Sequence, residues 1–350
     1  MASETTTSIE FLSQLLLSDD RSQAFPASEL EECLRLAHKH HVVVRWLQLL
    51  PETSVGQDPK VAEWAKTALT REQARIANAL PFLEAICTEF YSQGCDVTVI
   101  KSLDHWPDLG SDLDLYSNAQ PKDVIRIMRD RLKAEVAERS WGDRLAGKWN
   151  FNIPGLPEAV EVHVRRLGQT GEHVAWADAI PRRAVQVQRA QYAFRVAAAE
   201  DRLMICTLQR MYRHFYFRLS DIVDTAQLLE TAVVDFTCLR AYSEAAGIWK
   251  GVATYLAIVS DYVKRYRGEG ITLPPTVRAA SAFGGEKLSF GREFLRIPIV
   301  PESVELYTTE LTTLARHGEL RETFRLSLLP YLAVAAAVGQ KLTGSDKGIW

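Results

Sequence analysis

The chain has 350 residues, of which 24% are charged and 47% hydrophobic, and its formal net charge is −3. This composition is typical of a globular protein, and the length favours two or three domains. The near-neutral balance argues against a broad nucleic-acid footprint as the main source of affinity, although a local basic patch survives such an average.

The five cysteines are scattered and contain no Cys-x-x-Cys pair, which excludes a zinc ribbon and a thioredoxin-like redox site. The N-terminus lacks the basic and apolar segments of a signal peptide. The longest apolar run, from Leu326 to Gly339, contains Pro330 and is too short for a membrane span, so we expect a buried helix there. These features predict a cytoplasmic protein.

Residues 1–92 are expected to form an N-terminal helical region. An apolar stripe from Leu30 to Leu47 follows helical spacing and predicts one helix that ends before Pro51. Asp58-Pro59 is typical of a helix start, and the helix that follows is expected to run, with breaks, to Tyr91.

Residues 93–198 are expected to form a small mixed sheet, because short β-branched and alternating runs replace the helical pattern. A helix is expected over residues 121–138. After Glu200 a single apolar stripe from Met204 to Leu229 predicts a long helix, the first of a C-terminal helical domain over residues 199–350. The predicted fold class is therefore α+β. Strands are expected over residues 97–100, 113–116, 149–153, 160–164 and 192–196.

Two acids carry the first chemical signal. Asp112 and Asp114 are two residues apart on a predicted strand, so both carboxylates point to one face while Leu115 points to the other. Two carboxylates this close repel each other unless a positive group lies between them, and a divalent cation such as Mg²⁺ fills that role with oxygen ligands. The alternative is a strand edge with two solvated acids and no ligand.

A third acid strengthens this signal. The run Val160 to Arg165 alternates, so Glu161, His163 and Arg165 share one face of a strand. If this strand lies beside that of Asp112 and Asp114, Glu161 completes a cluster able to hold two metals that orient a triphosphate.

A group of cationic residues follows in the predicted helical domain, and its sequence pattern has two interpretations. Arg210, Arg213, His214 and Arg218 either line a cleft opposite the acids or form a partly solvated helix paired with Asp221 and Asp224.

These motifs resemble the nucleotidyltransferase fold of the DNA polymerase β superfamily, and within it the broad, mostly uncharacterised bacterial family with flanking helical domains. The matching elements are the strand over 97–100, the turn Lys101-Ser102, the pair Asp112-Leu-Asp114 after nine residues, and Glu161. An acidic dipeptide, Glu200-Asp201, opens the matching downstream helix, with His214, Arg218, Asp221 and Asp224 after it. The resemblance covers most of residues 30–230.

The resemblance implies transfer of a nucleoside monophosphate from an NTP such as ATP to an acceptor hydroxyl, with release of pyrophosphate and dependence on Mg²⁺ or Mn²⁺. Asp112, Asp114 and Glu161 would hold the metal and act in catalysis. Contacts to the nucleotide would come from Lys101, Ser102, Ser111, His163 and Arg165. A small molecule is favoured as acceptor over an RNA end or a protein side chain, because phosphate-dominated binding needs many Lys and Arg contacts.

Two other functions remain open. The turn Lys101-Ser102 lacks the glycine whose missing side chain lets a backbone approach a phosphate, which favours an inactive nucleotidyltransferase-like binding protein. Asp112-Leu-Asp114 also resembles the motif of metal-dependent glycosyltransferases, but those need alternating strands and helices upstream, where residues 1–92 are expected to be helical.

Overall fold

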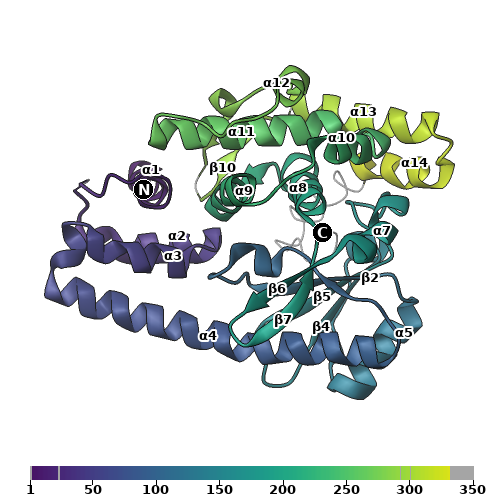
Figure 1. Ribbon diagram of the computed structural model, residues 1–350, viewed down its shortest axis with the longest axis horizontal. Coiled ribbons are helices and arrows are strands. Elements are labelled where there is room, and N and C mark those ends of the chain that lie inside the picture. The colour runs from purple at the N-terminus through teal and green to yellow at the C-terminus, as the bar shows by residue number, and fades with distance from the viewer. Residues whose placement is uncertain (1, 23, 292, 300, 332–350) are drawn as a thin grey trace.

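The computed structural model describes residues 2–22, 24–291, 293–299 and 301–331. A mixed seven-stranded sheet lies between the long helix α4 (Pro59–Ser92) and a layer of helices from the C-terminal half of the chain (Figure 1). A separate three-stranded sheet lies among those helices. This architecture confirms the predicted α+β class.

The N-terminal region is helical as predicted, but its breaks lie elsewhere. It contains α1 (Ala2–Leu17), α2 (Leu30–His40), α3 (Val43–Leu49) and α4. The single helix expected from Leu30 to Leu47 is wrong, because His41 adopts a left-handed conformation (φ 54°) and Asp108 accepts a hydrogen bond from Val44 N at 2.5 Å. α4 starts at the predicted Asp58 cap and continues without a break through Pro81.

All five predicted strands are present. The sheet order is β3-β4-β5-β2-β1-β7-β6, with β2 parallel to β5, β1 parallel to β7, and the other neighbours antiparallel. The strands are β1 (Thr98–Val99), β2 (Asp112–Ser117), β3 (Glu135–Val136), β4 (Lys148–Asn152), β5 (Ala159–Val164), β6 (Val185–Arg189) and β7 (Tyr192–Val196).

The helix expected over residues 121–138 is wrong in its second half. α5 (Pro121–Arg126) continues as a wider π-helical turn over Ile127–Arg131, and the chain then reverses at Lys133, whose φ is 56°. Val136 therefore lies in the edge strand β3, 42% exposed, instead of on the apolar face of a helix. Two helices complete the core, α6 (Trp141–Ala146) and α7 (Ala175–Arg183).

The long helix expected from Met204 to Leu229 is also wrong. α8 (Ala199–Thr207) passes into a π-helical segment, Leu208–His214, and the chain turns at Phe215, with φ 55°. Strand β8 (Tyr216–Phe217), which pairs with β10 (Leu295–Arg296), separates this segment from α9 (Leu219–Thr231).

The remaining elements are α10 (Phe236–Ala245), α11 (Trp249–Arg267), α12 (Pro275–Ala280), β9 (Ser289–Phe290), α13 (Glu302–Arg316) and α14 (Leu320–Ser327). Most of the apolar run from Leu326 to Gly339 lies outside the described residues. Among the described residues, none of the helices combines the length and apolar character that crossing a membrane requires.

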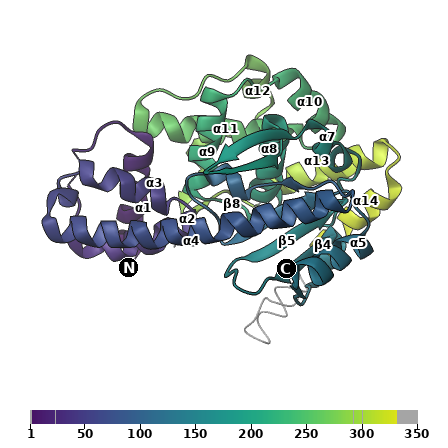
Figure 2. The same cartoon turned by 60° about the horizontal axis from the view of Figure 1, so that its bottom comes forward.

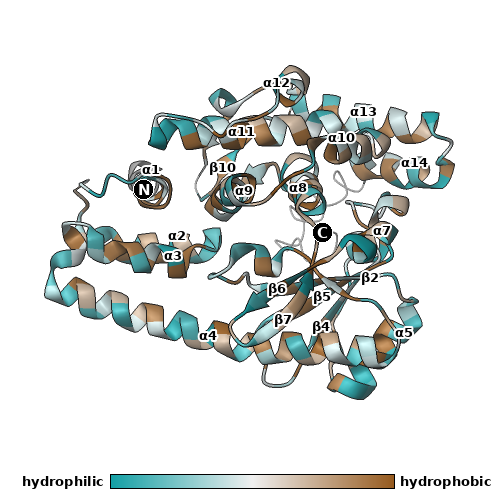
Figure 3. Ribbon diagram, viewed as in Figure 1, coloured by the Kyte–Doolittle hydropathy of each residue, from teal (hydrophilic) through white to brown (hydrophobic). Residues whose placement is uncertain are grey.

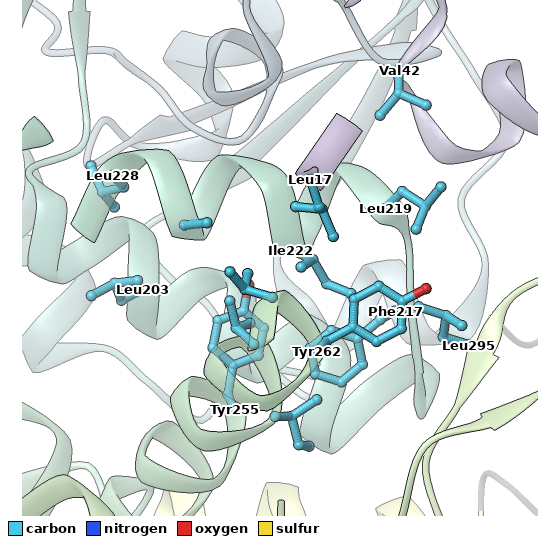
Figure 4. Packing of buried hydrophobic residues seen from close by; sticks show 14 of the residues in the cluster. Leu17, Val42, Leu203, Phe217, Leu219, Ile222, Leu228, Tyr255, Tyr262 and Leu295 are labelled. Atoms are coloured by element: carbon cyan, nitrogen blue, oxygen red, sulfur yellow. The ribbon is translucent and has the colours of Figure 1, made fainter. Parts of the chain in front are cut away.

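Two buried clusters fix which face of the sheet is polar. On one face, residues of α4 pack against Leu113, Leu115 and Val162. Figure 2 shows α4 crossing this face of the strands. Figure 3 shows that polar and apolar residues alternate along α4. The second cluster joins α8, α9 and α11, where Leu203, Ile222 and Tyr255 lie close together (Figure 4). Because strand residues alternate, the acids of β2 and β5 point away from α4, toward the second helical layer.

Candidate active site

The acids of two neighbouring strands meet on the polar face of the sheet. β2 and β5 are parallel and in register, with Asp114 opposite Glu161. Ligand atoms of Asp114, Glu161 and His163 all lie within 4.8 Å of one another. The alternation of each strand buries its leucines and valines against α4 and so places these polar groups together. The predicted proximity of Glu161 is confirmed for Asp114, whereas Asp112 lies opposite Ala159 and outside this close group.

Lys101 supplies a positive charge between these two acids. Its ammonium contacts the Asp114 carboxylate and lies 3.4 Å from Glu161 Oε1. The side chain is only 10% exposed, so Lys101 is not a surface residue.

The backbone at Lys101 holds the ammonium in this place. Lys101 has φ 63° and ψ −57°, and Ser102 N donates to Ile100 O at 2.7 Å, which closes a γ-turn. This conformation is rare and strained for a residue with a side chain, and backbone strain of this kind clusters at functional sites. Lys101 thus adopts a backbone conformation that glycine would adopt without strain.

Glu161 has two further partners. Lys148 Nζ lies 2.5 Å from Glu161 Oε2, and His163 Nε2 lies 2.7 Å from Glu161 Oε1. Sequence reasoning missed Lys148, although the alternation of β4 contains the signal: Lys148 and Asn150 fall on one face, and Trp149 falls on the other.

The two facing acids titrate differently. Burial raises the pKa of Asp114 to about 6, although the nearby ammonium of Lys101 acts in the opposite direction. For Glu161, burial is outweighed by Lys101 and Lys148, which hold its pKa well below the usual value. Cations therefore stabilise the charged form of Glu161 more than that of Asp114.

A cleft of about 240 Å³ opens above these acids, between the sheet and the wall formed by α8, the π-helical segment and the start of α9. Two arginines of this wall are paired: Arg202 with Asp104 at 2.8 Å, and Arg210 with Asp221 at 2.7 Å. Arg213 and Arg218 also line the cleft, and no carboxylate among the described residues lies within 4.0 Å of either guanidinium. The wall therefore presents two cations that no described carboxylate neutralises.

The other predicted residues have separate positions. Ser102 is buried and its Oγ accepts a hydrogen bond from Asp114 N at 2.6 Å, which ties the turn to β2. Ser111 Oγ donates to Asp112 Oδ1 at 3.2 Å, and both residues line the cleft. Arg165, with φ 61°, is exposed and lines a different cavity.

A buried network that sequence reasoning missed supports the cleft from the side of α3. Arg45 Nε lies 2.8 Å from Asp108 Oδ2, and Arg45 Nη1 lies 2.6 Å from Asp224 Oδ1. His105 Nδ1 lies 2.5 Å from Asp224 Oδ2. These contacts join α3, the loop before β2 and α9, three segments far apart in the sequence.

The donor set fits a hard divalent cation. Asp112, Asp114 and Glu161 offer carboxylate oxygens to the cleft, which are the ligands that Mg²⁺ prefers. The buried ammonium of Lys101 supplies a positive charge between Asp114 and Glu161, at the point where a cation would bind.

The comparisons with known proteins agree with this geometry. A family model described as uncharacterised nucleotidyltransferase matches residues 26–264, more than half of the chain. No curated protein matches the chain. The matched range includes α4, the turn at Lys101, both acid-bearing strands and the arginine wall of the cleft. The chain therefore belongs to the uncharacterised nucleotidyltransferase family.

Proposed function

We propose that this protein transfers a nucleoside monophosphate from an NTP to an acceptor hydroxyl in a metal-dependent reaction. The observation that carries the proposal is the pairing of Asp114 with Glu161, in register on parallel strands, at the floor of a cleft. Arg213 and Arg218 line the opposite wall, and neither has a carboxylate partner among the described residues. Acids on one side and free cations on the other suit a substrate that brings both metal and phosphates.

The metal would bind at the acid floor, by which we mean the part of the cleft formed by the carboxylates of Asp112, Asp114 and Glu161. Asp112, Asp114 and Glu161 would hold Mg²⁺ or Mn²⁺ through their carboxylate oxygens. When bound, such an ion neutralises phosphate charge and lowers the pKa of a hydroxyl that it contacts.

Residues of this chain would position the triphosphate. Arg213 and Arg218 would donate charge-assisted hydrogen bonds to the β- and γ-phosphates. Lys101, released from the acids when they hold a metal, would reach the phosphates as a point charge. Ser111 would contact the nucleotide from the loop before Asp112, and His163 would orient Glu161 through the contact at 2.7 Å.

The transfer step would then proceed as follows. The acceptor oxygen forms a bond to the α-phosphorus while the bond from that phosphorus to the bridging oxygen of the leaving group breaks. The hydroxyl proton passes to a carboxylate of the acid floor, and pyrophosphate leaves from the arginine wall. ATP is the first nucleotide to test, and a small molecule is the favoured acceptor.

An inactive nucleotidyltransferase-like binding protein is the second candidate. It is favoured by the absence of glycine from the turn at Lys101-Ser102. Against it stands the γ-turn of Lys101, which keeps the strained backbone that glycine would allow and directs an ammonium to the acids.

The proposal is tested with each of the four α-labelled NTPs, with Mg²⁺ or Mn²⁺ and a cell extract as the source of acceptor. Label transferred by the wild type but not by the Asp112→Asn/Asp114→Asn variant would identify the nucleotide and size the acceptor. If neither protein transfers label, and metal with NTP leaves the melting temperature of the wild type unchanged, the transfer proposal is wrong.

A further inference from the structure

A second cavity lies at the end of β2 and β5 opposite to Asp112. The segments just after β2, just before β4 and just after β5 line it together with α14. Among its described lining residues, Glu322 is the single carboxylate. We call it the arginine cavity, after the six side chains that line it: Arg139, Arg144, Arg165, Arg166, Arg321 and Arg325.

Most of this positive charge has no carboxylate partner among the residues that the structure describes. Arg166 is 3.6 Å from Glu322, while the other five arginines have no carboxylate within 4.0 Å in the part of the chain that the structure describes. The guanidinium groups also crowd one another: burial lowers the pKa of Arg325, and the charges of Arg166 and Arg321 lower it further. Like charges held together in this way destabilise the folded chain until an anion binds between them.

Three of the arginines are fixed in place by the fold. Arg325 Nε donates to Thr170 O at 2.9 Å, and Arg166 Nη1 donates to Gly171 O at 2.9 Å. The guanidinium carbon of Arg139 lies 3.8 Å from the ring centroid of Trp149. These contacts hold the three guanidinium groups in place and leave some of their N–H donors free, so the surface is rigid and positively charged. Arg144, Arg165 and Arg321 are exposed beside it.

Trp141 lies at the edge of this surface. The side chain of Trp141 is 64% exposed, and Arg144 lies over its ring at 5.5 Å from the centroid. An exposed aromatic ring next to several cations is the combination with which proteins bind single strands, because bases stack on the ring while phosphates contact the cations. Inorganic phosphate alone would leave the ring unused.

We propose that the arginine cavity and Trp141 bind a single-stranded nucleic acid. Six arginines supply contacts for more than one backbone phosphate, and Trp141 supplies a stacking platform for a base. A local surface of this kind is compatible with the net charge of −3. The proposal concerns binding alone, so it does not rest on the nucleotidyl transfer proposed above and can fail or succeed independently of it.

The test measures fluorescence anisotropy of labelled single strands of about 12 nucleotides, as RNA and as DNA of the same sequence, over a salt series starting at about 50 mM. We expect salt-dependent binding by the wild type. Arg144→Ala/Arg321→Ala should reduce the slope of log affinity against log salt by about 1.4, because each lost phosphate contact accounts for about 0.7. Trp141→Ala should weaken binding about tenfold.

Two further variants locate the bound strand. Arg278→Ala, on α12, removes an exposed arginine that pairs with Asp261 and should leave binding unchanged. Arg213→Ala removes a cation of the cleft and should also leave binding unchanged. The nucleic acid that binds more tightly, RNA or DNA of the same sequence, is the one that the cavity prefers.

Three results would overturn the proposal: absence of binding at the lowest salt, equal losses in Arg278→Ala and Arg144→Ala/Arg321→Ala, or a loss confined to Arg213→Ala. The double variant relieves repulsion, so its melting temperature should not fall below that of the wild type. A loss of binding without a loss of stability therefore reports on the cavity itself.

Discussion

Replacing Lys101 by methionine should strengthen metal binding while it weakens transfer. The ammonium of Lys101 occupies the place between Asp114 and Glu161 that a divalent cation would take. Methionine keeps an unbranched side chain of similar length and removes the charge. The acids of Lys101→Met are therefore free to bind a metal without first displacing an internal cation.

The size of this effect follows from the distance. Lys101 Nζ and Glu161 Oε1 lie 3.4 Å apart, and at an effective dielectric constant of about 20 such a pair is worth about 5 kcal/mol. A metal that displaces the ammonium loses only part of this energy, because the ammonium can move to the phosphates. A quarter of it, about 1.3 kcal/mol, already corresponds to about a tenfold change in affinity.

The assay is a titration with Mn²⁺ followed by electron paramagnetic resonance, without nucleotide. We expect the Kd for Mn²⁺ to fall about tenfold in Lys101→Met. Lys148→Met is the matched comparison and should show a smaller gain, because Lys148 contacts the other oxygen of Glu161 and also lies 3.5 Å from Asp143. Unchanged or weaker Mn²⁺ binding by Lys101→Met would refute the reasoning.

Three other predictions address phosphate binding, pH dependence and local stability. Arg213→Ala should raise the KM for NTP about tenfold through the loss of a charge-assisted hydrogen bond, and an unchanged KM in steady-state assays would contradict its role. Burial raises the pKa of Glu310 from 4.5 to about 7, so between these values the folded state holds a proton that the unfolded state has lost. The contribution of Glu310 to the free energy of unfolding should therefore be greatest below pH 4.5 and fall by about 3 kcal/mol as the pH rises to about 7. In denaturant titrations the difference between the wild type and Glu310→Gln should change by this amount over that range, and a constant difference would argue against it. Asp58→Ala should lower the free energy of unfolding by about 1 kcal/mol in the same titrations, because the Asp58 carboxylate caps α4 by accepting a hydrogen bond from Lys60 N at 2.8 Å. If the variant is as stable as the wild type, this cap contributes little.

The acid floor was predictable because it depends on local alternation. The pattern around Asp112, Asp114 and Glu161 fixes which face each strand buries, and a one-residue slip would expose every leucine and valine on that face. The fold class followed from the same patterns of strands and helices. Lys148 obeys this rule as well, but one lysine in a short strand gives a weak signal.

The ends of the helices at His41 and Phe215 and the arginine cavity could not be predicted from the local sequence pattern. His41 and Phe215 interrupt apolar stripes that are continuous in sequence, because contacts from distant segments favour left-handed conformations there: Asp108 caps α3, and β10 pairs with β8. The arginine cavity joins residues around Arg139, Arg165 and Arg325, which only the tertiary fold brings together. The domain limits near residues 92 and 198 stay a prediction.

The most direct test of the account compares Asp114→Asn with Asp104→Asn in the labelled NTP assay. Both residues line the cleft with side chains that are less than 10% exposed, but Asp104 is neutralised by Arg202 at 2.8 Å. The account predicts that Asp114→Asn loses at least about a hundredfold in transfer rate and that Asp104→Asn, with its fold intact by circular dichroism, keeps most of it. Full activity in Asp114→Asn, or the same loss in both variants, would contradict it.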